Sequence, residues 1–179
     1  MGPARHVAGR LTLAAKALLA TSCQSSPTPA PDAAAAAEVR RLVDAVCDWV
    51  SGPAGAPKDR NTLLALFVPE GQMFATATRN DGVHVVRQMP VGTFADLVIG
   101  EAQREPFYET SLCTRVDVFG GIAMAWSSYA ARRAPDQPPF ERGINSFQLV
   151  RTADGWRIVS VTWATESATL PLPAGMAGG

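Results

Sequence analysis

Three side chains on segments with strand-like alternation could carry acid–base chemistry. They are Glu109, Asp117 and Tyr129. A carboxyl group can take up or return a proton, and a phenol can donate a hydrogen bond where negative charge develops in a reaction. These residues are therefore the candidate catalytic groups. For Asp117 the structural alternative is a solvated charge at a strand end, because it stands close to a Gly-Gly turn.

A second polar set lies on the expected strand 141–151. Because side chains alternate between the faces of a strand, Asn145 lies on one face whereas Arg142 and Gln148 share the other. The functional interpretation places Asn145, or Arg142 with Gln148, in a pocket as hydrogen-bonding groups for a ligand. The structural alternative pairs Arg142 with a carboxylate such as Glu109 and lets the two amides satisfy backbone groups at a bulge.

Aromatic side chains supply the apolar part of the candidate pocket. Trp126, Trp156 and Trp163 fall on expected strands and Trp49 on an expected helix. Tryptophans in such places build cores and interfaces, and they also line apolar cavities. Trp163, together with Tyr129, completes the candidate ligand-pocket set.

Histidine and cysteine are too sparse for a metal site. The chain holds His6, His84 and three cysteines, without a Cys-x-x-Cys motif or a Cys/His cluster. We therefore expect no metal and no cofactor. Cys47 and Cys113 are interpreted as small buried hydrophobes, and a disulfide between them is the alternative in an exported protein.

Helices are expected at three places. Apolar residues recur at helical spacing over 38–50, which predicts a helix with one buried face. Asp59 is suited to cap a short second helix, and Thr93 with Asp96 resembles a capping box that opens a third helix ending near residue 104.

Six strands are expected around these helices. Along 108–118 the hydrophobicity alternates strictly, so Glu109 and Asp117 fall on the same face of a strand with two unlike faces. Turn signals at Asp81-Gly82 and Gly120-Gly121 separate neighbouring strands. The six expected segments are 72–78, 83–88, 108–118, 122–133, 141–151 and 156–166. Helices gathered before a run of antiparallel strands indicate an α+β fold.

The amino-terminal end is expected to lie outside the folded unit. Residues 1–23 carry three basic residues, no acid, an apolar segment and small residues before Cys23. This pattern predicts an export leader and resembles a bacterial lipoprotein signal, with Cys23 taking the lipid. The protein is then expected in the cell envelope as a lipoprotein, or as a periplasmic or secreted protein. An unprocessed cytoplasmic chain is the alternative. Residues 24–37 are expected to be a disordered tether, with the alanines able to join the next helix, residues 38–168 the domain and 169–179 a disordered tail.

Charge and length limit the classes of function. The 179-residue chain has 16 basic and 16 acidic residues, so it lacks the excess of cations that binds phosphate backbones, and nucleic acid is excluded as a partner. Removal of the leader would leave 13 basic residues against 16 acidic ones. No uncharged apolar run approaches the ~20 residues of a membrane helix, so the expected membrane contact is a lipid anchor alone.

Three stretches carry a family resemblance. VFGGIA (118–123), ERGINSFQL (141–149) and GWRIVSVTW (155–163), with the order of elements, resemble the nuclear transport factor 2-like superfamily and its functionally uncharacterised bacterial members. The resemblance covers about residues 38–167. It implies three helices packed on a strongly bent antiparallel sheet of about six strands, a cone-shaped pocket between them, and a homodimer through the outer face of the sheet.

The resemblance alone does not imply an activity, because this fold hosts several. Relatives such as ketosteroid isomerase place a general-base Asp on an early strand, yet the run 72–78 has no acid and no histidine. Polyketide-cyclase relatives use His with Asp, and the domain offers His84 alone. We therefore expect a domain that binds a small, largely apolar molecule or a partner. The alternative is a cofactor-independent isomerase or lyase that uses Glu109, Tyr129 or Asp117.

Overall fold

The computed structural model of the chain describes residues 30–79 and 81–178. The expected leader with Cys23, and the tether up to residue 29, lie outside the described residues. The elements, in chain order, are α1 (Ala30–Val50), α2 (Arg60–Leu64), β1 (Phe67–Thr78), β2 (His84–Pro90), α3 (Val91–Ala102), β3 (Tyr108–Phe119), β4 (Ile122–Arg132), β5 (Glu141–Thr152) and β6 (Gly155–Thr165). No described helix has the length and apolar character to cross a membrane.

The six strands form one curved sheet in the order β2-β1-β6-β5-β4-β3. The pairs β1–β2, β3–β4, β4–β5 and β5–β6 are antiparallel as expected, and β2 and β3 form the two edges of the sheet, whereas β1 and β6 run parallel. These two strands lie far apart in the sequence, so no hairpin fixes their relative direction. The expected α+β fold of three helices on a six-stranded sheet is confirmed.

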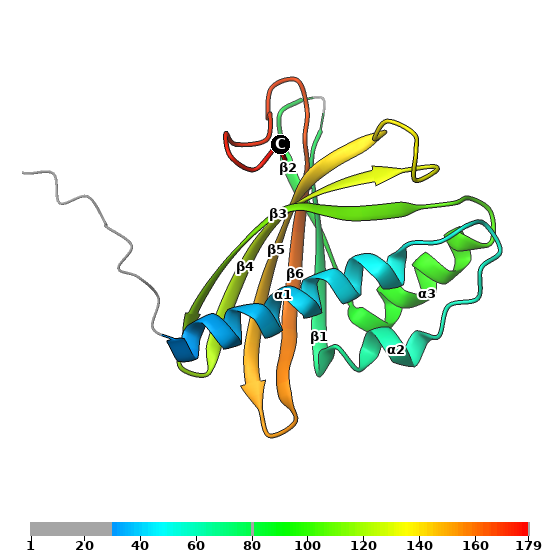
Figure 1. Ribbon diagram of the computed structural model, residues 1–179. Coiled ribbons are helices and arrows are strands. Elements are labelled where there is room, and N and C mark those ends of the chain that lie inside the picture. The colour runs from blue at the N-terminus through cyan, green and yellow to red at the C-terminus, as the bar shows by residue number, and fades with distance from the viewer. Residues whose placement is uncertain (1–29, 80, 179) are drawn as a thin grey trace, which may run out of the picture.

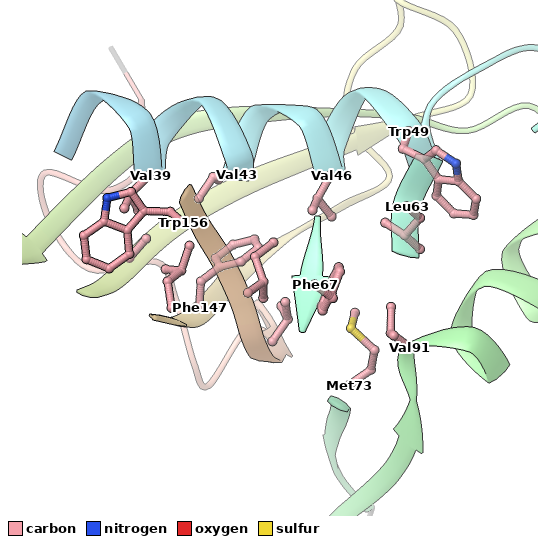
Figure 2. Packing of buried hydrophobic residues seen from close by; sticks show 14 of the residues in the cluster. Val39, Val43, Val46, Trp49, Leu63, Phe67, Met73, Val91, Phe147 and Trp156 are labelled. Carbon is pink, nitrogen blue, oxygen red and sulfur yellow. The ribbon is translucent and has the colours of Figure 1, made fainter. Parts of the chain in front are cut away.

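Helix α1 crosses the concave face of the sheet, and α2 and α3 lie beside its carboxyl-terminal end (Figure 1). The valines of α1, which recur at helical spacing, point into the core, where Val39 and Val43 are fully buried. Figure 2 shows these valines above Phe147 and Trp156 of the sheet. Burying each such aliphatic or aromatic side chain contributes about 1.5–3 kcal/mol, so this stripe fixes the helix on the sheet.

The helix boundaries differ in part from those expected. Asp59 caps α2 as expected, because its carboxylate accepts a hydrogen bond from the backbone N–H of Asn61. Helix α1 begins at Ala30 rather than 38, since alanine has the best helix propensity. The expected capping box is wrong: α3 starts after Pro90 without a side-chain cap, and Asp96 pairs with Arg60 instead.

A bulge divides β3 into two halves. Ser111 pairs with Tyr129 and Cys113 with Ser128, so Leu112 is an extra residue with no partner of its own. A bulge exchanges the faces of a strand beyond it. The strictly alternating interpretation of 108–118 is therefore wrong, because Glu109 faces α1 whereas Asp117 lies on the opposite, exposed face.

The carboxyl-terminal segment folds back after β6 instead of extending away as the expected tail (Figure 1). Met176 is buried, and the Leu172 backbone N–H donates to Glu166. Gly178 lies against the Leu112 side chain of β3. Residues 127–131 of β4 are all buried, which requires cover on both faces of the sheet. We call residues 167–178 the carboxyl-terminal strap, because they cover the outer face there.

Gly143 provides the space that the Tyr129 ring occupies on the neighbouring strand. A β-carbon at Gly143 would overlap the Ala164 carbonyl oxygen and lie 2.7 Å from the ring of Tyr129. Backbone cannot yield to such a contact as a flexible side chain can. Residue 143 must therefore be glycine for Tyr129 to cross β5.

We expect Gly143→Ala to lower the free energy of unfolding by about 2 kcal/mol, within the usual cost of overpacking a core. Gly100→Ala is the matched control, since nothing lies within 4 Å of its position in α3. Alanine in a helix interior should raise the stability by about 0.5–1 kcal/mol. Urea unfolding of both variants measures the difference, and equal effects would contradict the close approach at Gly143.

Candidate functional site

Polar side chains gather on the concave face where α1 meets β3, β4 and β5. We call this group the inner polar cluster; its members are Cys47, Glu109, Ser111, Ser127 and Asn145. Ser127 and Asn145 are buried, whereas Glu109 and Ser111 keep some exposure to solvent. Polar groups in such a place require hydrogen-bond partners or an open space that admits water.

The Glu109 carboxyl group is the centre of the cluster. Its Oε1 accepts a hydrogen bond from the Cys47 thiol at 3.4 Å and from the Asn145 amide at 3.3 Å. Its backbone N–H donates to Ser51 Oγ at 2.8 Å, which ties β3 to the end of α1. Oε1 is thus held by one helix, α1, and one strand, β5.

The other oxygen of Glu109, Oε2, is open. It receives no hydrogen bond within the described part of the chain. Among residues 30–79 and 81–178, Trp156 Nε1 is the one side-chain nitrogen or oxygen that is fully buried without a hydrogen-bond partner. Oε2 is therefore not fully buried. Oε2 therefore faces space that water or a ligand can reach.

Burial raises the pKa of Glu109 to about 7. The nearby Glu141 carboxylate adds to this rise, and the hydrogen bonds from Cys47 and Asn145 oppose it. Among the described residues no cation forms an ion pair with Glu109. At neutral pH the group therefore exists in both protonation states, which suits an acid–base or hydrogen-bonding site.

A chain of hydroxyl groups continues from the thiol across the sheet. Cys47 Sγ lies 3.6 Å from Ser111 Oγ, Ser127 Oγ donates to Ser111 Oγ at 3.5 Å, and Thr114 Oγ1 lies 2.8 Å from Ser127 Oγ. Burial, together with Glu109, raises the pKa of the Cys47 thiol well above its ordinary value. Cys47 is thus a protonated donor rather than a nucleophile. It is buried, but it is not the plain hydrophobe that the sequence suggests.

Tyr129 lies beside the cluster and is already engaged. Its hydroxyl donates to Glu141 Oε1 at 2.8 Å. Burial raises the pKa of the phenol, and the carboxylates of Glu141 and Glu109 raise it further while Thr165 opposes the rise. The protonated phenol therefore binds Glu141 and does not present a free donor beside Glu109.

The other candidate residues lie on different faces of the sheet. Trp163 is on the concave face, where its ring meets Phe94 edge-on at 5.9 Å. Arg142 is on the outer face and forms two hydrogen bonds with Glu166, at 2.7 and 3.0 Å, rather than the suggested pair with Glu109. Gln148 is exposed on the outer face, and the bulge of β5 and β6 lies at Gln148 rather than near Gly143.

Of the candidates named from the sequence, Glu109, Asn145, Tyr129 and Trp163 lie on the side that carries the cluster. Sequence reasoning missed three polar members of the cluster. Cys47, Ser111 and Ser127 were not proposed as site residues. Cys47 lies one residue beyond Val46 on the apolar stripe of α1, and such a polar atom beside a core stripe is the one signal that could have marked it. No three His, Cys, Asp or Glu residues in the described part of the chain are placed to hold a metal ion.

The two cysteines in the described part of the chain form no disulfide. Cys47 and Cys113 are both free. Cys47 points from α1 to the concave face, while Cys113 pairs in register with Ser128, whose side chain lies on the other face. A disulfide would require the Cα atoms to lie within about 7 Å with converging side chains.

Comparison with known proteins identifies the fold. No family model matches the sequence, and no curated protein matches it. A protein of unknown function from Mycobacterium tuberculosis is 13% identical, with a TM-score of 0.60, and the match covers 83% of each chain. A nuclear transport factor 2-like protein from Novosphingobium aromaticivorans is 20% identical, with a TM-score of 0.57 over 78% of this chain and 88% of that one.

A third similar structure is a proposed dehydratase of the nuclear transport factor 2-like family from Streptomyces avermitilis. It is 17% identical, with a TM-score of 0.57, and the match covers 77% of this chain and 99% of that chain. Identities at this level show a shared fold and nothing of the chemistry. The chain therefore has the cone-like nuclear transport factor 2-like fold.

The raised pKa of Glu109 predicts a particular pH dependence of stability. The folded state holds the proton up to about pH 7, whereas the unfolded chain releases it near the ordinary value of 4.5. The stability that the neutral carboxyl contributes is therefore lost as the pH rises through 7. Between pH 5 and pH 8 the wild type should lose on the order of 2 kcal/mol that Glu109→Gln retains.

Urea unfolding at the two pH values tests this expectation. The glutamine oxygen can still accept from Cys47 and Asn145, and its amide can point to the open side. Asp117→Asn is the control, because Asp117 is exposed on the other face of the sheet, and it should follow the wild type. A Glu109→Gln variant with the wild-type pH dependence would contradict the placement of Glu109.

Proposed function

We propose that the domain binds a small, largely apolar molecule on its concave face, with Glu109 as the polar anchor. The observation that carries this proposal is the open Oε2 of an otherwise held and desolvated carboxyl group. A buried carboxyl group without a cation costs folding free energy. A ligand that forms a hydrogen bond with Oε2 would supply the missing partner and offset this cost.

The surroundings of Glu109 support a ligand with much apolar surface. Phe94, Val98 and Ile99 of α3, with Trp163 of β6, are only partly buried where they meet the core. Trp163 pairs in register with Asn145, which in turn contacts Glu109. Ligand sites typically combine apolar walls with a few fixed polar groups. A ligand with one hydroxyl or carbonyl group matches this arrangement, because Glu109 can accept or donate near pH 7.

Binding can be measured with 1-indanol and 2-tetralone, which carry a hydroxyl and a carbonyl group on the same apolar frame. We expect saturable binding by ligand-observed NMR, and Glu109→Leu should weaken it at least about tenfold, the cost of losing a hydrogen bond to a charged group. Asp117→Asn should leave it unchanged. A Glu109→Leu variant that binds both probes with the affinity and the stoichiometry of the wild type would disprove the anchor.

Acid–base catalysis is a second candidate function, favoured by the pKa of about 7 at Glu109. A general acid or base works best when its pKa lies near the working pH. The proposed dehydratase from Streptomyces avermitilis shares the fold and supports a search for elimination chemistry. Tyr129 and Asp117 have no direct part in this version, because one is bound to Glu141 and the other lies on the opposite face.

Glu109→Gln separates the two candidates. For a binding domain, the variant should bind the two probes within about threefold of the wild type, since an amide still forms the hydrogen bond. For an enzyme, any turnover found by substrate screening should fall by about 10²–10⁴-fold, because the amide cannot exchange the proton. A turnover that survives this substitution would exclude Glu109 as the acid or base.

A further inference from the structure

The outer face of the sheet holds a pocket of about 280 Å³ beneath the carboxyl-terminal strap. Its floor comes from β4, β5 and β6, and its far wall from the strap. Its lining includes Trp126, Ile144, Ser146, Thr162, Ala164 and Leu172. We propose that this pocket is a binding site for a small neutral apolar molecule, one or two rings in size, that carries one hydroxyl or carbonyl group.

The floor is a cross-strand row with two hydroxyl groups. Trp126 pairs in register with Ser146, and Ser146 pairs with Thr162. Side chains directly opposite on neighbouring strands lie on the same face, about 5 Å apart. The Trp126 ring therefore lies next to the Ser146 hydroxyl, and the Thr162 hydroxyl follows on its other side.

Neither hydroxyl has a hydrogen-bond partner among residues 30–79 and 81–178. Ser146 and Thr162 form no side-chain hydrogen bond in the described part of the chain, and both keep partial exposure. Neither hydroxyl oxygen is fully buried, since Trp156 Nε1 is the one fully buried side-chain polar atom without a partner among the described residues. Two neighbouring hydroxyl groups, open to a pocket with apolar walls, can fix the orientation of a single polar group on a ligand.

The wall formed by the strap is held in place before any ligand arrives. Arg142 binds Glu166 through two hydrogen bonds at 2.7 and 3.0 Å, and Glu166 also accepts from the Leu172 backbone N–H at 3.0 Å. Two prolines, Pro171 and Pro173, restrict the strap on either side of Leu172. A site whose wall is already ordered loses less entropy on binding.

Charge and size define the class of ligand. The Leu172 N–H and the Arg142 guanidinium lower the pKa of Glu166, so this wall of the pocket carries a carboxylate whose partners are already occupied. A ligand anion would be repelled, and a ligand cation would have to compete with Arg142. The volume of about 280 Å³ lies just below the range for small-molecule pockets, about 300–1,000 Å³, so a neutral molecule of one or two rings fits.

This site is independent of Glu109. The pocket lies on the opposite face of the sheet, since Ser146 alternates with the concave-facing Asn145 along β5. Failure of one site therefore leaves the other untouched. A second copy of the chain on the outer face is the competing occupant, and the experiment below distinguishes it.

The test uses 2-naphthol and naphthalene with the full chain, measured by isothermal titration calorimetry. We expect saturable binding of 2-naphthol to a site that Glu109→Leu leaves intact. Ser146→Ala and Thr162→Val should each weaken 2-naphthol about fivefold, the usual effect of one neutral hydrogen bond, and leave naphthalene unchanged. Ala164→Leu should weaken both probes at least tenfold, because its side chain fills the pocket.

Gln148→Ala is the matched control, since Gln148 lies on the same face of β5, two residues from Ser146, and outside the pocket. It should bind both probes like the wild type. Thermal unfolding of each variant establishes that the fold is kept. The proposal is overturned if 2-naphthol does not saturate, or if Ala164→Leu leaves its affinity unchanged. It is also overturned if Glu109→Leu abolishes binding, which would place the probe on the concave face.

Sedimentation velocity measures the oligomeric state and so tests whether a second copy of the chain occupies the outer face. The wild type and Ala164→Leu should have the same oligomeric state, with or without 2-naphthol. A dimer that 2-naphthol or Ala164→Leu dissociates would show that a second copy occupies the outer face, and the ligand proposal would be wrong.

Discussion

The packing of α1 on the concave face of the sheet is the constraint on which the rest of the structure depends. Its valine stripe removes Val39 and Val43 completely from water. The same contact carries the last turns of the helix to β3, where Cys47 and Ser51 meet Glu109 through its side chain and its backbone. The hydrophobic effect thus positions a polar cluster, and a carboxyl group is desolvated because a core forms beside it.

The periods of the sequence were sufficient to find nearly every element, because each helix and strand buries one face and so shows a 3.6- or 2-residue period. Where a single residue breaks the period, the prediction of faces failed. The extra residue Leu112 puts Glu109 and Asp117 on opposite faces of β3, and the alternation of the sequence does not reveal this bulge. Pairing between distant segments was equally inaccessible, as the parallel contact of β1 with β6 shows.

The partners of side chains also depend on strand faces and on the pairing of distant segments. The structural alternative paired Arg142 with a carboxylate such as Glu109, yet the partner is Glu166, which directly follows β6 and is also held by the strap. The strap itself contains few bulky apolar residues and resembles a disordered tail in composition. In the structure Met176 is nevertheless buried and Leu172 lines the pocket on the outer face, a tertiary effect that local composition does not record.

The two faces of the sheet solve the problem of buried polarity in different ways. On the outer face, Glu166 remains charged because Arg142 and a backbone N–H compensate it. On the concave face no cation pairs with Glu109 among the described residues, so the proton itself is the compensating group. A proton donor on a ligand at Oε2 would stabilise the carboxylate and lower the pKa of Glu109, whereas an apolar group there would raise it. Protonation of Glu109 and ligand binding must therefore be thermodynamically linked, whichever chemistry the ligand undergoes.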